Sequence, residues 1–305
     1  MELIWIPIAI LAALMQAVRT AAQKSLNARL STRMTTYVRS LFGLPVSVLY
    51  LWAVMRYEGL GWPDLETGYL GYCIAAATTQ VIATYLLIWL FQMRNFAVGT
   101  MLSKTDVMQT ALIGSVLFSE AISAVGRIAI GLTIVGVVSI SIGRVGLGKL
   151  GTGEMGLAEA LVAKPTLIGL ATGFFFCMSY LFLREASLGL GQGGFLYRAA
   201  WTLVIVGVLQ VAVVGAGLMV TEPASFRGIG RAIGPCLFIG VTSAIGSVGW
   251  FTAMTLENAS YVKAVGQVEV VFTLTISALY FREHINRLEL FGIAVIVAGV
   301  LLFLL

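Results

Sequence analysis

Apolar stretches of about twenty residues, bounded by charged residues, glycine or proline, follow one another along most of the chain. A helix of about 20 apolar residues crosses a hydrocarbon core of roughly 30 Å. The runs are continuous, whereas barrel strands alternate, and unpaired backbone groups are costly in lipid, so helices are favoured over a barrel. The pattern predicts an all-α polytopic membrane protein with ten transmembrane helices, near 3–21, 35–55, 69–91, 97–118, 124–143, 165–183, 195–220, 233–254, 261–281 and 288–305.

Composition supports the same class. Of the 305 residues, 59% are hydrophobic and only 11% are charged, whereas soluble domains average about 25% charged residues. A soluble globule is therefore excluded, and we expect a multi-pass integral membrane protein of a bacterial inner (plasma) membrane. The net charge of +5 comes mostly from residues at helix ends, where basic side chains set topology, so a nucleic-acid partner is not expected.

The two ends of the chain repeat one another. A single shift of 163 residues superposes several residues of the fourth and fifth predicted spans on the ninth and tenth. The matched pairs include Asn95/Asn258, Asp106/Glu269, Thr110/Thr273, Phe118/Phe281, Glu120/Glu283 and Gly136/Gly299. Five spans per half is an odd number, so the second half must insert upside down, as in many transporters. We expect two inverted five-helix repeats, 1–145 and 164–305, joined by a connecting loop over 146–163.

The paired acids resemble a known family. Asp106 to Glu120 and Glu269 to Glu283 both keep a separation of fourteen residues, which resembles the EamA-like branch of the drug/metabolite transporter superfamily. Arg39 and Arg198, near the start of the second helix of each half, are also similar to that family. Relatives often have Glu-Pro where Val107 and Val270 follow the acids here, so no proline predicts a kink. The resemblance implies ten spans and export or exchange of small metabolites.

Polar residues within the spans are the candidate site, because a charge in the bilayer costs about 2.5–3.5 kcal/mol. The candidate substrate-binding residues are Arg39, Gln80, Lys104, Asp106, Arg198, Trp250, Lys263, Gln267 and Glu269. The deep charges are roughly neutral to mildly basic in sum, which favours a zwitterion or a small organic anion over a multivalent cation.

Each candidate also has a structural interpretation. Asp106 and Glu269 could form structural ion pairs, or they could bind substrate, a proton or a cation. The ammonium of Lys104 lies deep and favours a substrate phosphate or carboxylate, whereas Lys263 lies near its helix end, where snorkelling towards headgroups is favoured. Arg39 and Arg198 could snorkel as well. Glu120 and Glu283 lie in tight turns and are expected to set loop geometry.

We expect a secondary-active transporter, an exporter or exchanger, that works by alternating access between the repeats. Expected partners are a small-molecule substrate, membrane lipids, a coupling proton or cation, and a second copy of the chain in a homodimer. No cofactor or metal site is expected, because the three cysteines form no CxxC pair and there is a single histidine. The same scarcity argues against a membrane-embedded enzyme. A flippase for a lipid-linked headgroup on the same fold is the alternative.

Orientation stays open at this stage. Basic residues are concentrated in the loops after odd-numbered spans, which would place those loops in the cytoplasm and both termini outside. The family resemblance implies the opposite. Both arguments require only that the termini share one side.

Overall fold

The computed structural model describes residues 3–65, 67–93, 103–145, 164–280 and 287–302. These residues form helices and no strand. Seven spans of the described chain are long and apolar enough to cross a membrane: α1 Trp5–Leu26, α2 Thr32–Glu58, α3 Thr67–Met93, most of α9 Lys164–Gly189, α10 Phe195–Thr221, α12 Ile233–Leu256, and α13 Ala259–Val265 with α14 Val268–Leu279. The predicted class, an all-α multi-pass membrane protein, is confirmed.

Other elements complete the described chain. They are α5 Asp106–Leu117, α6 Ala124–Val145, the 3-10 turn η1 Pro223–Ser225, α11 Phe226–Arg231 and α15 Arg287–Leu302. Of the residues singled out above, Asn95, Phe281, Glu283 and the connection 146–163 lie outside the described residues. We call the part of the chain before residue 146 the first half, and the part after residue 163 the second half.

Local sequence explains where α2 begins and ends. The Ser31 hydroxyl accepts a hydrogen bond from the Met34 backbone N–H at 3.2 Å, which satisfies one of the open donors of the first turn. Gly59 ends the helix with φ +67°, a left-handed conformation that glycine adopts without a Cβ penalty. The side chain of Ser31 also donates to Glu222 at 2.6 Å and so connects α2 to the end of α10.

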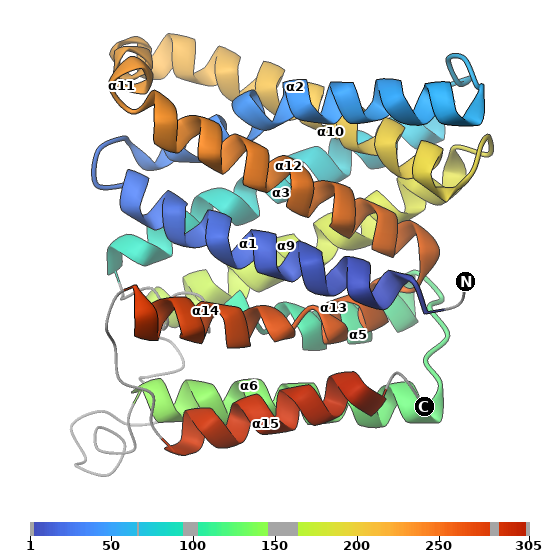
Figure 1. Cartoon of the computed structure of the whole chain (residues 1–305), viewed down its shortest axis with the longest axis vertical. Coiled ribbons are helices and arrows are strands. Elements are labelled where there is room, and N and C mark those ends of the chain that lie inside the picture. Colours follow the sequence, from blue (N-terminus) through green and yellow to red (C-terminus); the bar gives the residue numbers. More distant parts are fainter. Residues whose placement is uncertain (1–2, 66, 94–102, 146–163, 281–286, 303–305) are drawn as a thin grey trace.

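The helices pack in successive levels (Figure 1). Helices α6 and α15 lie side by side at one end of the molecule, and α2 and α10 lie at the other. Between these ends, α1 packs on α12, α3 packs on α9, and α5 packs on both α9 and α13. Helix α1 begins and α15 ends on the same side of the molecule. Contacts between the two halves therefore run through the whole height of the structure.

A helix is interrupted in the middle of the molecule, and a turn lies directly before another helix. Gly266 and Gln267 form a turn between α13 and α14, and Lys104 and Thr105 form a turn directly before α5. Around the first turn the Glu269 N–H bonds to the carbonyl of Gly266, three residues back, so the α-helical pattern is lost locally. The sequence has no proline here that would predict a kink, and the helix is nevertheless interrupted at Gly266 and Gln267. A Cβ on Gly266 would lie 2.4 Å from the Trp250 ring, so this residue must stay small where the indole packs.

Helices α6 and α15 approach closely at Gly136. A Cβ built there would lie 2.6 Å from Ile296 Cγ1 and 2.7 Å from the Gly292 carbonyl oxygen. Small residues at such crossings let backbones of membrane helices approach each other.

We expect Gly136→Ala to lower the free energy of unfolding by about 1–3 kcal/mol through overpacking. Unfolding in mixed detergent micelles would measure this. Gly131→Ala on the same helix is the matched control, because no atom lies within 4 Å of its Cβ position, and it should not destabilise.

Candidate functional site

The interrupted helices place four charged side chains inside the protein. Lys104 lies in the turn before α5, Asp106 begins α5, Lys263 lies in the last turn of α13 and Glu269 lies in the first turn of α14. Each is at most 6% exposed. The sequence singled out all four as candidate binding residues, and the structure brings them together.

These charges form two ion pairs, and each pair joins the two halves of the chain. Lys104 Nζ lies 2.7 Å from Glu269 Oε2, and Lys263 Nζ lies 2.8 Å from Asp106 Oδ2. Gln16 Nε2 of α1 donates to the same Glu269 oxygen at 2.8 Å. Each acid is thus paired with a lysine of the other half. The second carboxylate oxygen of Asp106, Oδ1, has no hydrogen-bond partner within the described chain.

Lys263 does not snorkel towards headgroups, so the structural interpretation favoured for it is wrong. Its side chain is 1% exposed, and its ammonium lies 4.2 Å from the Tyr180 ring centroid and 4.9 Å from that of Trp250. Cation–π attraction of this kind is worth about 2 kcal/mol when the cation is desolvated. The reason is the surroundings of the ammonium, which is held by Asp106 and by two aromatic rings inside the protein.

Next to the ion pairs lies a small polar cavity of about 10 Å³, the space of about one water molecule. Its lining includes Gln16, Arg19, Arg39, Gln80 and Trp250. Arg39 is 6% exposed and donates from Nη1 to the Thr84 hydroxyl at 2.6 Å, so it does not snorkel either. In this conformation the site is closed.

A second cavity of about 30 Å³ adjoins the first and shares Arg39 and Gln80 with it. Gln210 Nε2 donates to Gln80 Oε1 at 2.7 Å, and Ser40 Oγ donates to Gln210 Oε1 at 2.7 Å. This chain of hydrogen bonds runs from α2 through α10 to α3. It extends the polar interior from the ion pairs towards the α2–α10 end of the molecule.

The other predicted residues occupy different positions. Gln267 is fully buried beside the ion pairs, and its amide donates to the Lys263 carbonyl at 3.1 Å. Arg198 is half-buried in the first turn of α10 and lines neither polar cavity. Its symmetry with Arg39 in the sequence is therefore not matched by a shared place at the cavity, and its role in binding stays a prediction.

Sequence reasoning missed Arg19 and Gln16, which both line the cavity from α1. A signal for Arg19 was present, because it is a charged residue inside the predicted span 3–21. Gln16 lies three residues earlier, on the same helix face. The aromatic wall of Phe176, Tyr180 and Phe251 could not have been found, since aromatic residues are common throughout the spans.

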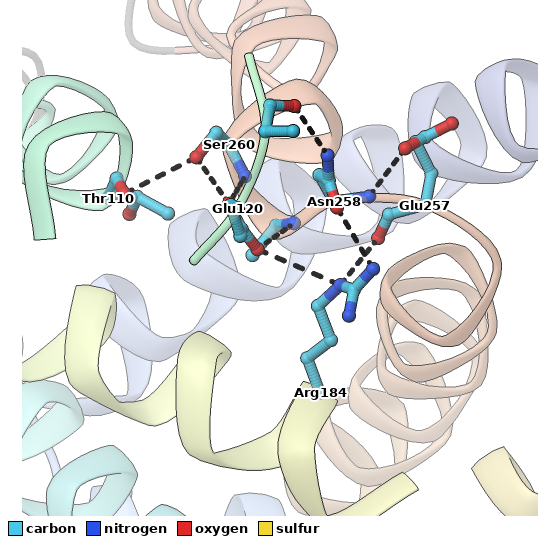
Figure 2. Close-up of polar contacts among 8 residues, drawn as sticks. Thr110, Glu120, Arg184, Glu257, Asn258 and Ser260 are labelled. Carbon is cyan, nitrogen blue, oxygen red and sulfur yellow. Dashed lines mark hydrogen bonds and ion pairs between the residues drawn. The ribbon is translucent and has the colours of Figure 1, made fainter. Parts of the chain in front are cut away.

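Glu120 connects the halves at a second place (Figure 2). Its Oε1 accepts from the Ala259 N–H at 2.8 Å, and its Oε2 accepts from the Ser260 N–H at 3.2 Å and the Ser260 hydroxyl at 2.6 Å. Arg184 Nε lies 3.7 Å from the same carboxylate and donates to the Glu257 carbonyl and the Asn258 side chain. Glu120 thus caps the start of α13, the helix that carries Lys263. The expectation that it sets loop geometry agrees with these contacts.

The fold and the buried charges define a multi-pass membrane protein with a polar centre inside the bilayer, where ionisable residues are rare and mark transport sites. The chain belongs to the EamA-like transporter family, whose profile matches residues 3–142 and again residues 164–305. The resemblance seen in the paired acids is confirmed. Members of this family are membrane transporters of the drug/metabolite type and not enzymes.

Comparisons with other proteins add the fold alone. A search of curated proteins finds no match. Among solved structures, 28 chains match. One crystal structure of a protein superposes with a TM-score of 0.61 at 11% identity and covers 96% of this chain and 98% of its own.

Proposed function

We propose that this protein is a secondary-active transporter of a small zwitterionic or anionic metabolite, an exporter or exchanger that works by alternating access. In this proposal it has ten transmembrane helices in two inverted five-helix repeats, 1–145 and 164–305, joined by the loop 146–163. The observation that carries it is the pair of ion pairs Lys104–Glu269 and Lys263–Asp106, which cross between the halves. Breaking and remaking such contacts lets two halves move relative to each other around a central site.

The helix contacts support the inverted repeats. If the halves are repeats, α1 corresponds to α9, α3 to α12, and α5 to α13 with α14. The contact between α1 and α12 then corresponds to the contact between α9 and α3, and both contacts exist. Likewise α1–α14 becomes α9–α5, and both are present. The contacts α2–α10 and α6–α15 each join a helix to its counterpart in the other half. Discontinuous helices with charged residues at the breaks are a recurring feature of transporters built from inverted repeats.

Asp106 supports a role in coupling or in recognition of a substrate amine. It is 3% exposed, and Oδ1 is left without a partner in the described chain although Oδ2 is paired with Lys263. A buried carboxylate oxygen without a partner costs free energy, so a proton, a cation or an ammonium group of the substrate would be stabilised there.

The proposal is tested by flux in proteoliposomes. A panel of radiolabelled amino acids and small organic anions would be offered under an imposed proton gradient, and separately under a sodium gradient. We expect at least one solute to accumulate several-fold above protein-free vesicles, and the uptake to collapse when an ionophore dissipates the gradient. If the uptake of every solute in the panel were independent of both gradients, secondary-active transport would be contradicted.

A lipid flippase is a second candidate, because one observation favours it. An open apolar cavity of about 690 Å³ lies between α1, α12 and α14, with Arg29 in its lining. Such a groove fits an acyl chain, with the guanidinium near a phosphate headgroup. Scrambling of fluorescent lipid in the same vesicles, without solute uptake, would favour this candidate over metabolite transport.

A further inference from the structure

Two buried arginines face the central cavity without a carboxylate partner. Arg19 is 5% exposed and Arg39 is 6% exposed, and both line the same cavity. No carboxylate of the described chain lies within 4.0 Å of either guanidinium. Within the described residues, the Arg39 guanidinium bonds to one hydroxyl, that of Thr84, and the Arg19 Nε–H has no acceptor. Trp250 Nε1, another donor in the lining, also has none.

The charge balance of the buried centre is therefore positive. Four basic side chains, Arg19, Arg39, Lys104 and Lys263, face two acidic ones, Asp106 and Glu269, which leaves two positive charges within the described residues. Guanidinium groups stay protonated in proteins. Burying an uncompensated charge is unfavourable. A ligand with a net negative charge would remove that cost, whereas a ligand with a net positive charge would increase it.

The two lysines are not available for the same task, because each is already paired with a carboxylate at 2.7–2.8 Å. The arginines are also the better groups for it. A planar guanidinium offers parallel N–H donors that match the two oxygens of a carboxylate or phosphate. The cavity therefore contains N–H donors without acceptors, and the oxygens of an oxyanion would accept from them.

We infer that Arg19 and Arg39 together bind the oxyanion group, a carboxylate or phosphate, of the transported substrate. This inference rests on the proposed function and names the substrate class for the same site. The remaining wall is aromatic, with Phe176, Tyr180 and Phe251 beside Trp250. The ligand is therefore a small organic anion with an apolar, flat body. Asp106 and Glu269, both held by lysines, do not repel it as free carboxylates would.

Substrate entry requires the helices around the cavity to separate, because its volume of about 10 Å³ is far below that of an organic anion. Arg19 lies on α1 and Arg39 on α2, so an anion between them connects two different helices. Like charges on these helices repel when the site is empty of anion. Binding therefore stabilises the arrangement in which the two guanidiniums lie close together.

Benzoate is a suitable probe, since it joins a carboxylate to a flat apolar ring, and benzamide is its neutral counterpart. Binding to the full-length protein in lipid nanodiscs would be measured by calorimetry and by the shift in Tm. We expect benzoate and phenyl phosphate to bind and benzamide to bind at least tenfold more weakly. Arg19→Gln and Arg39→Gln should each weaken benzoate binding about tenfold or more, in line with the loss of a charged hydrogen bond.

Controls separate this site from other basic positions. Arg56 lies on α2, as Arg39 does, but its side chain is exposed. Arg56→Gln should therefore leave benzoate binding unchanged. Arg29→Gln, which alters the lining of the apolar cavity between α1, α12 and α14, should also leave benzoate binding unchanged. If a glutamine variant does not fold, Arg19→Lys and Arg39→Lys replace it, and we expect them to bind several-fold more weakly because they lack the two-pronged donor.

Four results would overturn the inference: benzoate does not bind the unmodified protein, benzamide binds as tightly as benzoate, the Arg19 and Arg39 variants bind benzoate normally, or Arg29→Gln loses benzoate binding. The proposed function fails separately. If benzoate binds but no solute shows gradient-driven flux, the anion site is supported and the transporter mechanism is contradicted. If gradient-driven flux is unchanged in both arginine variants, the transporter mechanism is supported and the anion site is contradicted.

Discussion

Asp106→Asn should lower the free energy of unfolding by about 3–5 kcal/mol and abolish transport. The substitution leaves Lys263, which is 1% exposed, without its counter-ion 2.8 Å away. Removing one partner of a buried pair costs that much because the other charge stays desolvated. Unfolding of the purified protein in mixed micelles measures the stability, and vesicle flux measures the function.

A double variant separates the structural from the functional role of this pair. Asp106→Asn combined with Lys263→Met removes both charges, and replacing a whole buried pair is often neutral or stabilising. We expect the double variant to regain stability but not transport. Recovery of both would reduce the pair to a structural contact. Arg33→Gln is the matched control, since it breaks an exposed 3.6 Å pair with Glu222 and should cost less than about 1 kcal/mol.

Glu120→Gln should destabilise the protein by about 3 kcal/mol. Its carboxylate accepts hydrogen bonds from two backbone N–H groups and one hydroxyl at the start of α13, and lies 3.7 Å from Arg184. Hydrogen bonds to a charged group contribute about 1.5–3 kcal/mol each. The NH2 group of the glutamine would face N–H and O–H donors and could not accept from them. Because α13 carries Lys263, we also expect flux to fall in membranes where the variant is folded.

Glu58→Gln is the comparison for Glu120→Gln. Glu58 also accepts from a backbone N–H at the start of a helix of the other half, that of Gly194 at 2.8 Å, but the contact is exposed. Water replaces a lost exposed hydrogen bond, so the expected cost is about 1 kcal/mol or less. Equal effects of the two substitutions would show that burial of the Glu120 cap has no special importance.

Much of the fold followed from residue order alone. The described helices lie where the apolar runs predicted spans, because lipid leaves the backbone few options and each run must bond within itself. The residues Lys104, Asp106, Lys263 and Glu269 were also found in advance, since charges inside apolar runs need a reason. Their meeting in one buried centre depends on contacts between the two halves rather than on any local pattern.

Other parts of the site were not predictable in this way. Residues two apart on a helix lie on nearly opposite faces, but Lys104 lies in a turn before α5, so this rule does not apply to Lys104 and Asp106. Lys263 was assigned to the membrane surface because it lies near a helix end in the sequence. Its contacts with Asp106, Tyr180 and Trp250 come from other helices and leave no local pattern.

The sequence by itself determined the class of the protein, the positions of most of its helices, its family and several charged residues as candidates for the site. The tertiary structure decided which acid pairs with which lysine, that Arg19 joins Arg39 while Arg198 does not, and that Glu120 caps a helix of the other half. The division has a physical cause. Burial in lipid depends on local composition, whereas ion pairing depends on distances between helices more than a hundred residues apart in the chain.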